Sequence, residues 1–219
     1  MVSYYLNSYR PLCFNPTGRA AITKHGLPPF IDGSCRREPD FESKAPSISA
    51  LCRKEKFAPR LIPNDHIIYT IVQLLYDGEP GWALVASLNV IEQFKSHEAA
   101  ANWYGAQKYV LPSNCLIPDN PPQPFHLTTQ KLPKEVAARV GNTPDPVLAV
   151  RLWDATYSRR ARDCGLFLAC RTDFLELWHP PILRLSDFLN VFGKKPSTQN
   201  PPKISLEQYQ GLMEFTKSG

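Results

Sequence analysis

The sequence lacks several features that identify common protein classes. No apolar run in its 219 residues approaches the roughly 18 residues that a membrane-spanning helix requires, so we expect no membrane association. Its first residues are rich in tyrosine, with asparagine and arginine, where a secretory signal would have an apolar stretch, which favours a cytoplasmic protein. The six cysteines form no C-x-x-C pair, so zinc ribbons and fingers are not expected and we interpret the cysteines as reduced thiols.

Common enzyme signatures are also missing. The chain has no G-x-x-x-x-G-K-[ST] loop, no G-x-G-x-x-G fingerprint and no G-x-S-x-G elbow. The H-x-E and P-C-x-x-C motifs of zinc deaminases are absent as well. The histidines are scattered without an H-x-x-x-H pair, so we predict no metal site and no cofactor. These absences argue against the common enzyme classes without excluding an unfamiliar one.

Proline and positive charge are what the sequence has in excess. Its 22 prolines are about twice the usual frequency, which predicts many irregular connections and short elements. Hydrophobic residues make up 43% of the chain, enough to form a folded core. With 25 basic and 20 acidic residues the net charge is +5, which mildly favours a polyanionic partner.

Hydrophobic patterning predicts a hairpin followed by a helix in the middle of the chain. His66–Tyr76 is nearly continuous in apolar and β-branched residues, as in a strand buried on both faces. Leu84–Ile91 alternates so that one face of a second strand is wholly apolar. Ser96 is a typical cap for the helix that follows, and Trp103 lies on the stripe that we expect to pack on the sheet.

The remaining patterning predicts one main domain. Further strands are expected at 147–153 and 165–170, and short helices at 133–141, 186–193 and from residue 205. We therefore expect a single α+β domain over residues 1–195, of which 1–57 is irregular because it shows little periodicity. Residues 196–219 are expected to form a linker and a C-terminal helix.

The region Leu61–Trp103 resembles a known superfamily. Pro63-Asn64-Asp65 forms a turn before the first strand, and the second strand ends in an aromatic residue two positions before Ser96. This order resembles the PUA-like superfamily, particularly its ASCH and EVE members and the nucleotide-modification-associated domains, although Asn64-Asp65 replaces their Gly-Asp. The resemblance implies a partly closed β-barrel with flanking short helices that binds nucleic acid, often at a modified or flipped base.

The densest polar stretch of the chain, His25–Glu42, is the first candidate site. Arg36 and Arg37 can bind phosphates, and Asp32 can accept a hydrogen bond from a base edge. If the protein is an enzyme, the candidate catalytic residues are a general base at His25 or Asp32 and a nucleophile at Cys35. The alternative is a surface loop whose charges pair locally.

A second candidate site is the run 154–162, which we expect to be a loop between two strands. Arg159, Arg160 and Arg162 can form a phosphate clamp, because guanidinium groups bind phosphate through a planar fork. Trp153 and Tyr157 can supply surfaces on which a base stacks. The alternative is a solvated loop whose charges aid solubility.

Together these features predict a nucleic-acid-binding module that recognises a modified or extruded base, in the context of DNA or RNA modification or restriction. One alternative is an enzyme that acts on a nucleotide or base, with its active site in the 25–42 loop. Another is an accessory domain that binds protein. The choice between DNA and RNA and the oligomeric state stay open at this point.

Overall fold

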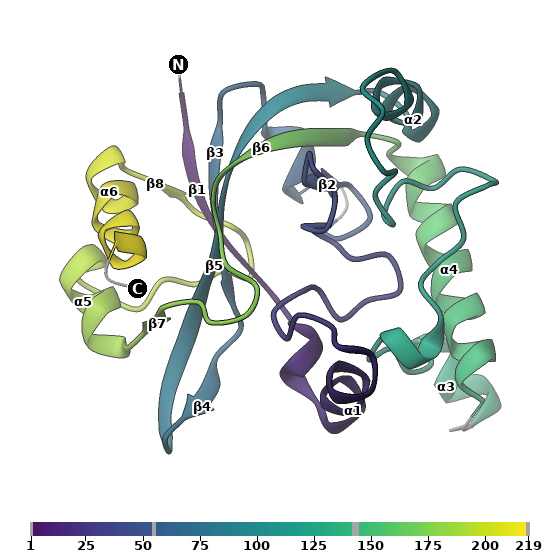
Figure 1. Ribbon diagram of the computed structural model, residues 1–219, viewed down its shortest axis with the longest axis horizontal. Helices are drawn as coiled ribbons and strands as arrows, with labels where there is room; N and C mark the ends of the chain where they lie inside the picture. Colours follow the sequence, from purple (N-terminus) through teal and green to yellow (C-terminus); the bar gives the residue numbers. More distant parts are fainter. Residues whose placement is uncertain (1, 54–55, 142–144, 218–219) are drawn as a thin grey trace.

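One sheet organises the fold of the computed structural model, which describes residues 2–53, 56–141 and 145–217. Eight strands of these residues join in it, with the order β2-β6-β5-β3-β1-β8 and with β4 and β7 paired to β5 (Figure 1). The strands are β1 Tyr4–Tyr9, β2 Ser47–Ser49, β3 His66–Ile71, β4 Leu74–Tyr76, β5 Glu79–Phe94, β6 Phe167–Leu175, β7 Ile182–Leu183 and β8 Lys203–Ile204. The α-helices are α1 Pro16–His25, α2 His97–Ala106, α3 Lys134–Val140, α4 Pro146–Asp163, α5 Leu185–Phe192 and α6 Leu206–Glu214.

The predicted hairpin is confirmed at the centre of this sheet. Strands β3 and β5 pair antiparallel, and β5 curves strongly along its length (Figure 1). Asn64 adopts a left-handed conformation (φ +75°), which asparagine tolerates better than most residues. The Asp65 carboxylate next to it accepts hydrogen bonds from the backbone N–H groups of Ser3 and Ile62. This turn therefore fixes the start of β3 beside β1.

Helix α2 begins where the sequence predicted. The Ser96 hydroxyl accepts a hydrogen bond from the Ala99 backbone N–H (3.1 Å), which caps the helix. The buried positions are His97, Ala100 and Tyr104, whereas Trp103 is only partly buried against the same cluster as the last two. The helix is thus rotated from the predicted stripe, so that Tyr104 rather than Trp103 is its main anchor.

Alternation along the strands gives the sheet two apolar faces. Tyr5, Ile67 and Tyr69 lie in one core cluster, while Leu6 and Ile68 lie in another. In Figure 1, α5 and α6 cover one face, and α1, α2 and α4 lie on the other side together with the long N-terminal loop. The second side holds the polar residues discussed below.

Three sequence-based expectations about secondary structure were wrong. Residues 1–57 are not wholly irregular, because β1 lies between β3 and β8 in the sheet and α1 follows it. The strand expected at 147–153 and the loop expected at 154–162 are both parts of one helix, α4. Asp145 caps this helix by accepting hydrogen bonds from the next two free N–H groups, and the buried Ala149, Val150 and Tyr157 recur at helical spacing.

The architecture is mixed α and β, built on an open sheet. Among the described strands, β2 and β8 form its two ends, so this pairing does not show a barrel. The C-terminal segment joins the same sheet, because β8 pairs antiparallel with β1 and α6 buries Leu212 against the α5 side. No helix in the described parts of the chain is long and apolar enough to cross a membrane.

Candidate functional site

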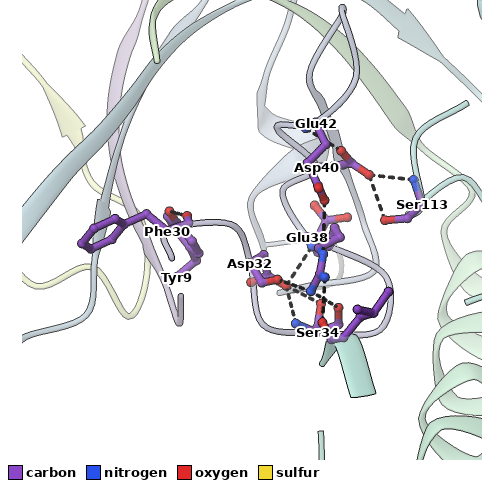
Figure 2. Close-up of polar contacts among 10 residues, drawn as sticks. Tyr9, Phe30, Asp32, Ser34, Glu38, Asp40, Glu42 and Ser113 are labelled. Atoms are coloured by element: carbon purple, nitrogen blue, oxygen red, sulfur yellow. Dashed lines mark hydrogen bonds and ion pairs between the residues drawn. The ribbon is translucent and has the colours of Figure 1, made fainter. Parts of the chain in front are cut away.

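Residues 30–41 of the 25–42 loop lie mostly in the interior of the protein. Asp32, Arg36, Arg37, Glu38 and Asp40 are each at most 6% exposed. Asp32 Oδ1 accepts hydrogen bonds from the backbone N–H groups of Ser34 (2.8 Å) and Glu38 (3.1 Å), and from the Ser34 hydroxyl (Figure 2). The loop thus folds around its own carboxylate, which positions the residues that follow.

Glu38 and Asp40 tie this loop to two other segments. Glu38 accepts hydrogen bonds from the Ser49 backbone N–H (2.8 Å), from the Ser49 hydroxyl and from the Asn114 amide (3.0 Å). Asp40 accepts two from Ser113, as Figure 2 shows. Burial raises the pKa of Glu38 to about 8 and that of Asp32 to about 6, although their hydrogen bonds oppose both shifts.

The two arginines of the loop bind protein groups in this structure. Arg37 donates to the carbonyls of Asp32 (2.6 Å) and Leu127 (2.7 Å). Arg36 pairs with the Asp154 carboxylate (2.6 Å) and donates to two backbone carbonyls. Their role as nucleic-acid ligands stays a prediction, and their observed contacts are those of residues that hold segments of the fold together.

The candidate catalytic residues of this loop are not gathered around one reacting centre. His25 is exposed at the end of α1, where its ring contacts that of His126 (5.0 Å between centroids). Cys35 is fully buried, and burial raises the pKa of its thiol to about 12. A thiol with so high a pKa is protonated near neutral pH and is a weak nucleophile. The described residues also contain no group of three or more potential metal ligands.

The arginines of the second candidate site lie on helix α4. Arg160 contacts other parts of the protein, whereas Arg159 and Arg162 face the solvent. Arg160 donates to the Leu51 carbonyl (2.7 Å) and covers the Tyr157 ring. Arg159 and Arg162 are exposed, and so is Arg151, which lies eight residues before Arg159 on roughly the same face of α4. None of these three arginines forms an ion pair with another described residue. The outer face of α4 therefore carries three unpaired guanidinium groups.

The predicted stacking residues pack on each other. The Trp153 and Tyr157 rings are stacked with centroids 5.8 Å apart. Tyr157 is buried and its hydroxyl accepts a hydrogen bond from the Gln130 amide (2.8 Å), while the Trp153 indole donates to the Lys131 carbonyl. Trp153 remains partly exposed, so of the two only it presents substantial surface to a ligand.

An open groove of about 690 Å³ lies between the start of α2, residues 116–122 and the second half of α4. It includes Arg36 and Arg162 from the two predicted sites. Asp154 and Ser158 of the lining belong to the 154–162 run, although neither was singled out there. Sequence reasoning missed the remaining polar residues, which are Ser96, His97, Glu98 and Asn120. The first three are separated from Asn120 by more than 20 residues, and no local motif joins them to it.

His97 is the most unusual residue of this groove. It is 3% exposed, and its Nδ1 accepts a hydrogen bond from the Leu116 backbone N–H (3.0 Å). Burial lowers the pKa of His97 to about 4, so its ring is neutral near pH 7 and carries its proton on Nε2. Among the described residues, that Nε2 is one of two buried side-chain polar atoms without a hydrogen-bond partner. An unpaired buried donor of this kind costs about 1–3 kcal/mol.

Comparisons with protein-family models, with curated proteins and with solved structures found no match to this chain. The functional argument therefore rests on the groove and on the outer face of α4.

Proposed function

We propose that the protein is a nucleic-acid-binding module that holds phosphates on the outer face of α4 and takes one modified or extruded base into the adjoining groove. The observation that carries this proposal is the position of Arg162. It belongs both to the unpaired arginines of α4 and to the lining of the groove. A nucleotide whose phosphate contacts Arg162 thus has its base next to the groove.

The spacing of the arginines suits a nucleic-acid strand. Arg151 and Arg159 are eight residues apart, which is about 12 Å along a helix axis. One DNA strand carries a phosphate about every 3.4 Å of duplex axis, so the α4 face spans several phosphates. Contacts of this kind position a strand without reading its sequence.

The groove suits a planar ring. Its volume lies within the range of about 300–1,000 Å³ that is typical of small-ligand sites. Leu116, Ile117 and Pro118 supply apolar wall, while His97 and Glu98 offer hydrogen-bonding groups. This combination of apolar wall and few polar groups is the usual composition of a site that orients its ligand.

The finer parts of the proposal are a PUA-like, partly closed barrel, a cytoplasmic location and a role in DNA or RNA modification or restriction. The segment on which the resemblance was based folds as the β3–β5 hairpin followed by α2, and this order of elements supports the relationship. The start of α2 also contributes His97 to the groove. An enzymatic role centred on the 25–42 loop receives less support, because Asp32 and Cys35 are buried in the fold.

The test is oligonucleotide binding measured by fluorescence anisotropy at several salt concentrations. We expect the double variant Arg159→Ala/Arg162→Ala to bind more weakly than the unaltered protein. Each lost phosphate contact should reduce the magnitude of the log–log salt slope by roughly 0.7–0.9. The matched control is Arg171→Ala on β6, which removes another exposed arginine and should leave the slope unchanged.

Absence of binding to single- and double-stranded DNA and RNA at low salt would contradict this proposal. That result would favour the role of a protein-binding accessory domain. Binding with an unchanged slope in the double variant would place the phosphates elsewhere on the molecule.

A further inference from the structure

We infer that the groove selects a neutral ring with a carbonyl oxygen, which accepts a hydrogen bond from His97 Nε2, and that it excludes phosphate from its interior. This inference rests on the proposed function and names the chemical class that the groove takes. Three features of the described lining carry it: a fixed neutral donor, a balance of charge, and apolar walls without a large aromatic ring.

The donor is held in one orientation. The Leu116 N–H fixes Nδ1 as an acceptor, and a flip of the ring would break that hydrogen bond. The edge-on contact with Phe167 (5.3 Å between centroids) packs against the ring from another side. The lowered pKa keeps the ring uncharged near neutral pH. His97 thus offers one N–H and no positive charge, which suits a neutral acceptor.

The charges around the groove argue against an anion in its interior. Two arginines, Arg36 and Arg162, are balanced by two carboxylates, Glu98 and Asp154. Arg36 is nearly fully buried and already pairs with Asp154 at 2.6 Å, so its charge is largely compensated. Arg162 is exposed and lies on α4 next to the unpaired Arg159. Phosphate is therefore favoured outside the groove, on α4, and a neutral group inside it.

The walls determine what else recognises the ring. Apart from His97, the described lining residues include no aromatic side chain, and the apolar surface comes from Leu116, Ile117 and neighbouring prolines. Aromatic stacking, which often holds bases in nucleic-acid-binding proteins, is thus replaced here by aliphatic contact. Since aliphatic contact distinguishes bases poorly, discrimination must come from hydrogen bonds.

The first experiment compares ligands that differ in one carbonyl. Single-stranded oligonucleotides with a central hypoxanthine or a central purine differ at the six-position carbonyl and its adjacent ring proton, and those with uracil or 2-pyrimidinone differ likewise at the four-position. We expect the oligonucleotides without the carbonyl to bind about 5- to 150-fold more weakly, the range expected when a buried donor stays unpaired. Equal affinities within both pairs, with normal salt dependence, would overturn this inference and leave the proposed function intact.

The variant His97→Phe keeps an aromatic ring at this position but removes both ring nitrogens. We expect it to bind the two members of each pair equally, while keeping the salt slope of the unaltered protein. Because this variant also loses the hydrogen bond from Leu116, circular dichroism should first show that it folds.

A nuclear magnetic resonance experiment on the unaltered protein keeps the test independent of that variant. With ¹⁵N-labelled histidine, free inosine should shift the His97 Nε2–H signal, whereas nebularine and inorganic phosphate should not. The exposed His179 is the control signal and should not shift with any of the three. A shift of His97 by phosphate would refute the exclusion of anions, and no shift by inosine would refute carbonyl binding. Failure to bind any oligonucleotide would instead overturn the proposed function and this inference with it.

Discussion

At the scale of single residues, Glu38 is a side chain that couples folding to pH near neutrality. Its carboxyl is buried and receives hydrogen bonds from Ser49 and Asn114, yet burial still raises its pKa to about 8. In the unfolded chain a glutamate has a pKa of about 4.3. Between these two values the folded protein binds more protons than the unfolded chain, so stability falls as pH rises.

The corresponding prediction concerns Glu38→Gln. The unaltered protein should lose up to a few kcal/mol of unfolding free energy between about pH 5 and pH 8. The variant cannot ionise at this position, so its loss over the same interval should be smaller. Asp32, with its pKa raised to about 6, adds a slope of the same sign at the acidic end, whereas His97, with its pKa lowered to about 4, adds one of opposite sign below about pH 6.5. Urea unfolding at several pH values measures this, with the exposed Glu214→Gln as control. Equal slopes in all three proteins would show that Glu38 ionises normally in the fold.

At the scale of elements, local chemistry determined what the sequence could predict. The β3–β5 hairpin and the start of α2 carry alternation, turn residues and a serine cap, and each is where these features indicate. The first half of α4 was misread because its short apolar run, which starts at Val147, fits a strand as well as a helix. The cap at Asp145 and the recurrence of buried residues at helical spacing distinguish the two. The β1 strand was missed because its neighbours β3 and β8 are distant in the sequence.

The site was also predicted only in part, because some of its residues depend on contacts between segments that are distant in the sequence. Arg36 and Arg162 lie in segments whose charge marked them as candidates. No sequence feature singled out His97 as a site residue. Its neutral ring and fixed orientation depend on the hydrogen bond from the Leu116 backbone and on packing against Phe167. Those contacts exist only once the sheet has brought α2, residues 116–122 and α4 together.

The element-scale prediction tests whether the α2 cap positions His97. Ser96→Ala removes the hydroxyl that accepts from the Ala99 N–H and should cost about 1 kcal/mol of stability. Because His97 is the first residue of this helix, the variant should also discriminate less between hypoxanthine and purine oligonucleotides. Ser205→Ala removes the equivalent cap from α6 on the other side of the sheet. It should cost similar stability and leave discrimination unchanged. If both variants discriminate like the unaltered protein, the cap does not position His97.

At the scale of the whole molecule, one sheet supports two separate apolar layers. The face toward α5 and α6 packs Leu6, Ile68 and Leu212, while the face toward the N-terminal loop packs Tyr5 and Tyr69. Helices α2 and α4, which contribute residues to the groove, lie on this second side (Figure 1). A change in the α6 layer should therefore affect stability without reaching the proposed binding surface.

Leu212→Ala tests this separation. Leu212 is fully buried on α6, so its truncation leaves a cavity and should lower the unfolding free energy by about 2–5 kcal/mol. Below the unfolding transition, oligonucleotide affinity and its salt slope should match those of the unaltered protein. Urea unfolding followed by both far- and near-ultraviolet circular dichroism should give one coincident transition, because β8 and α6 belong to the same sheet and core as β1. Two separate transitions would mean that the C-terminal segment folds as an independent unit. Weaker binding by the folded variant would mean that the two layers are coupled through the sheet.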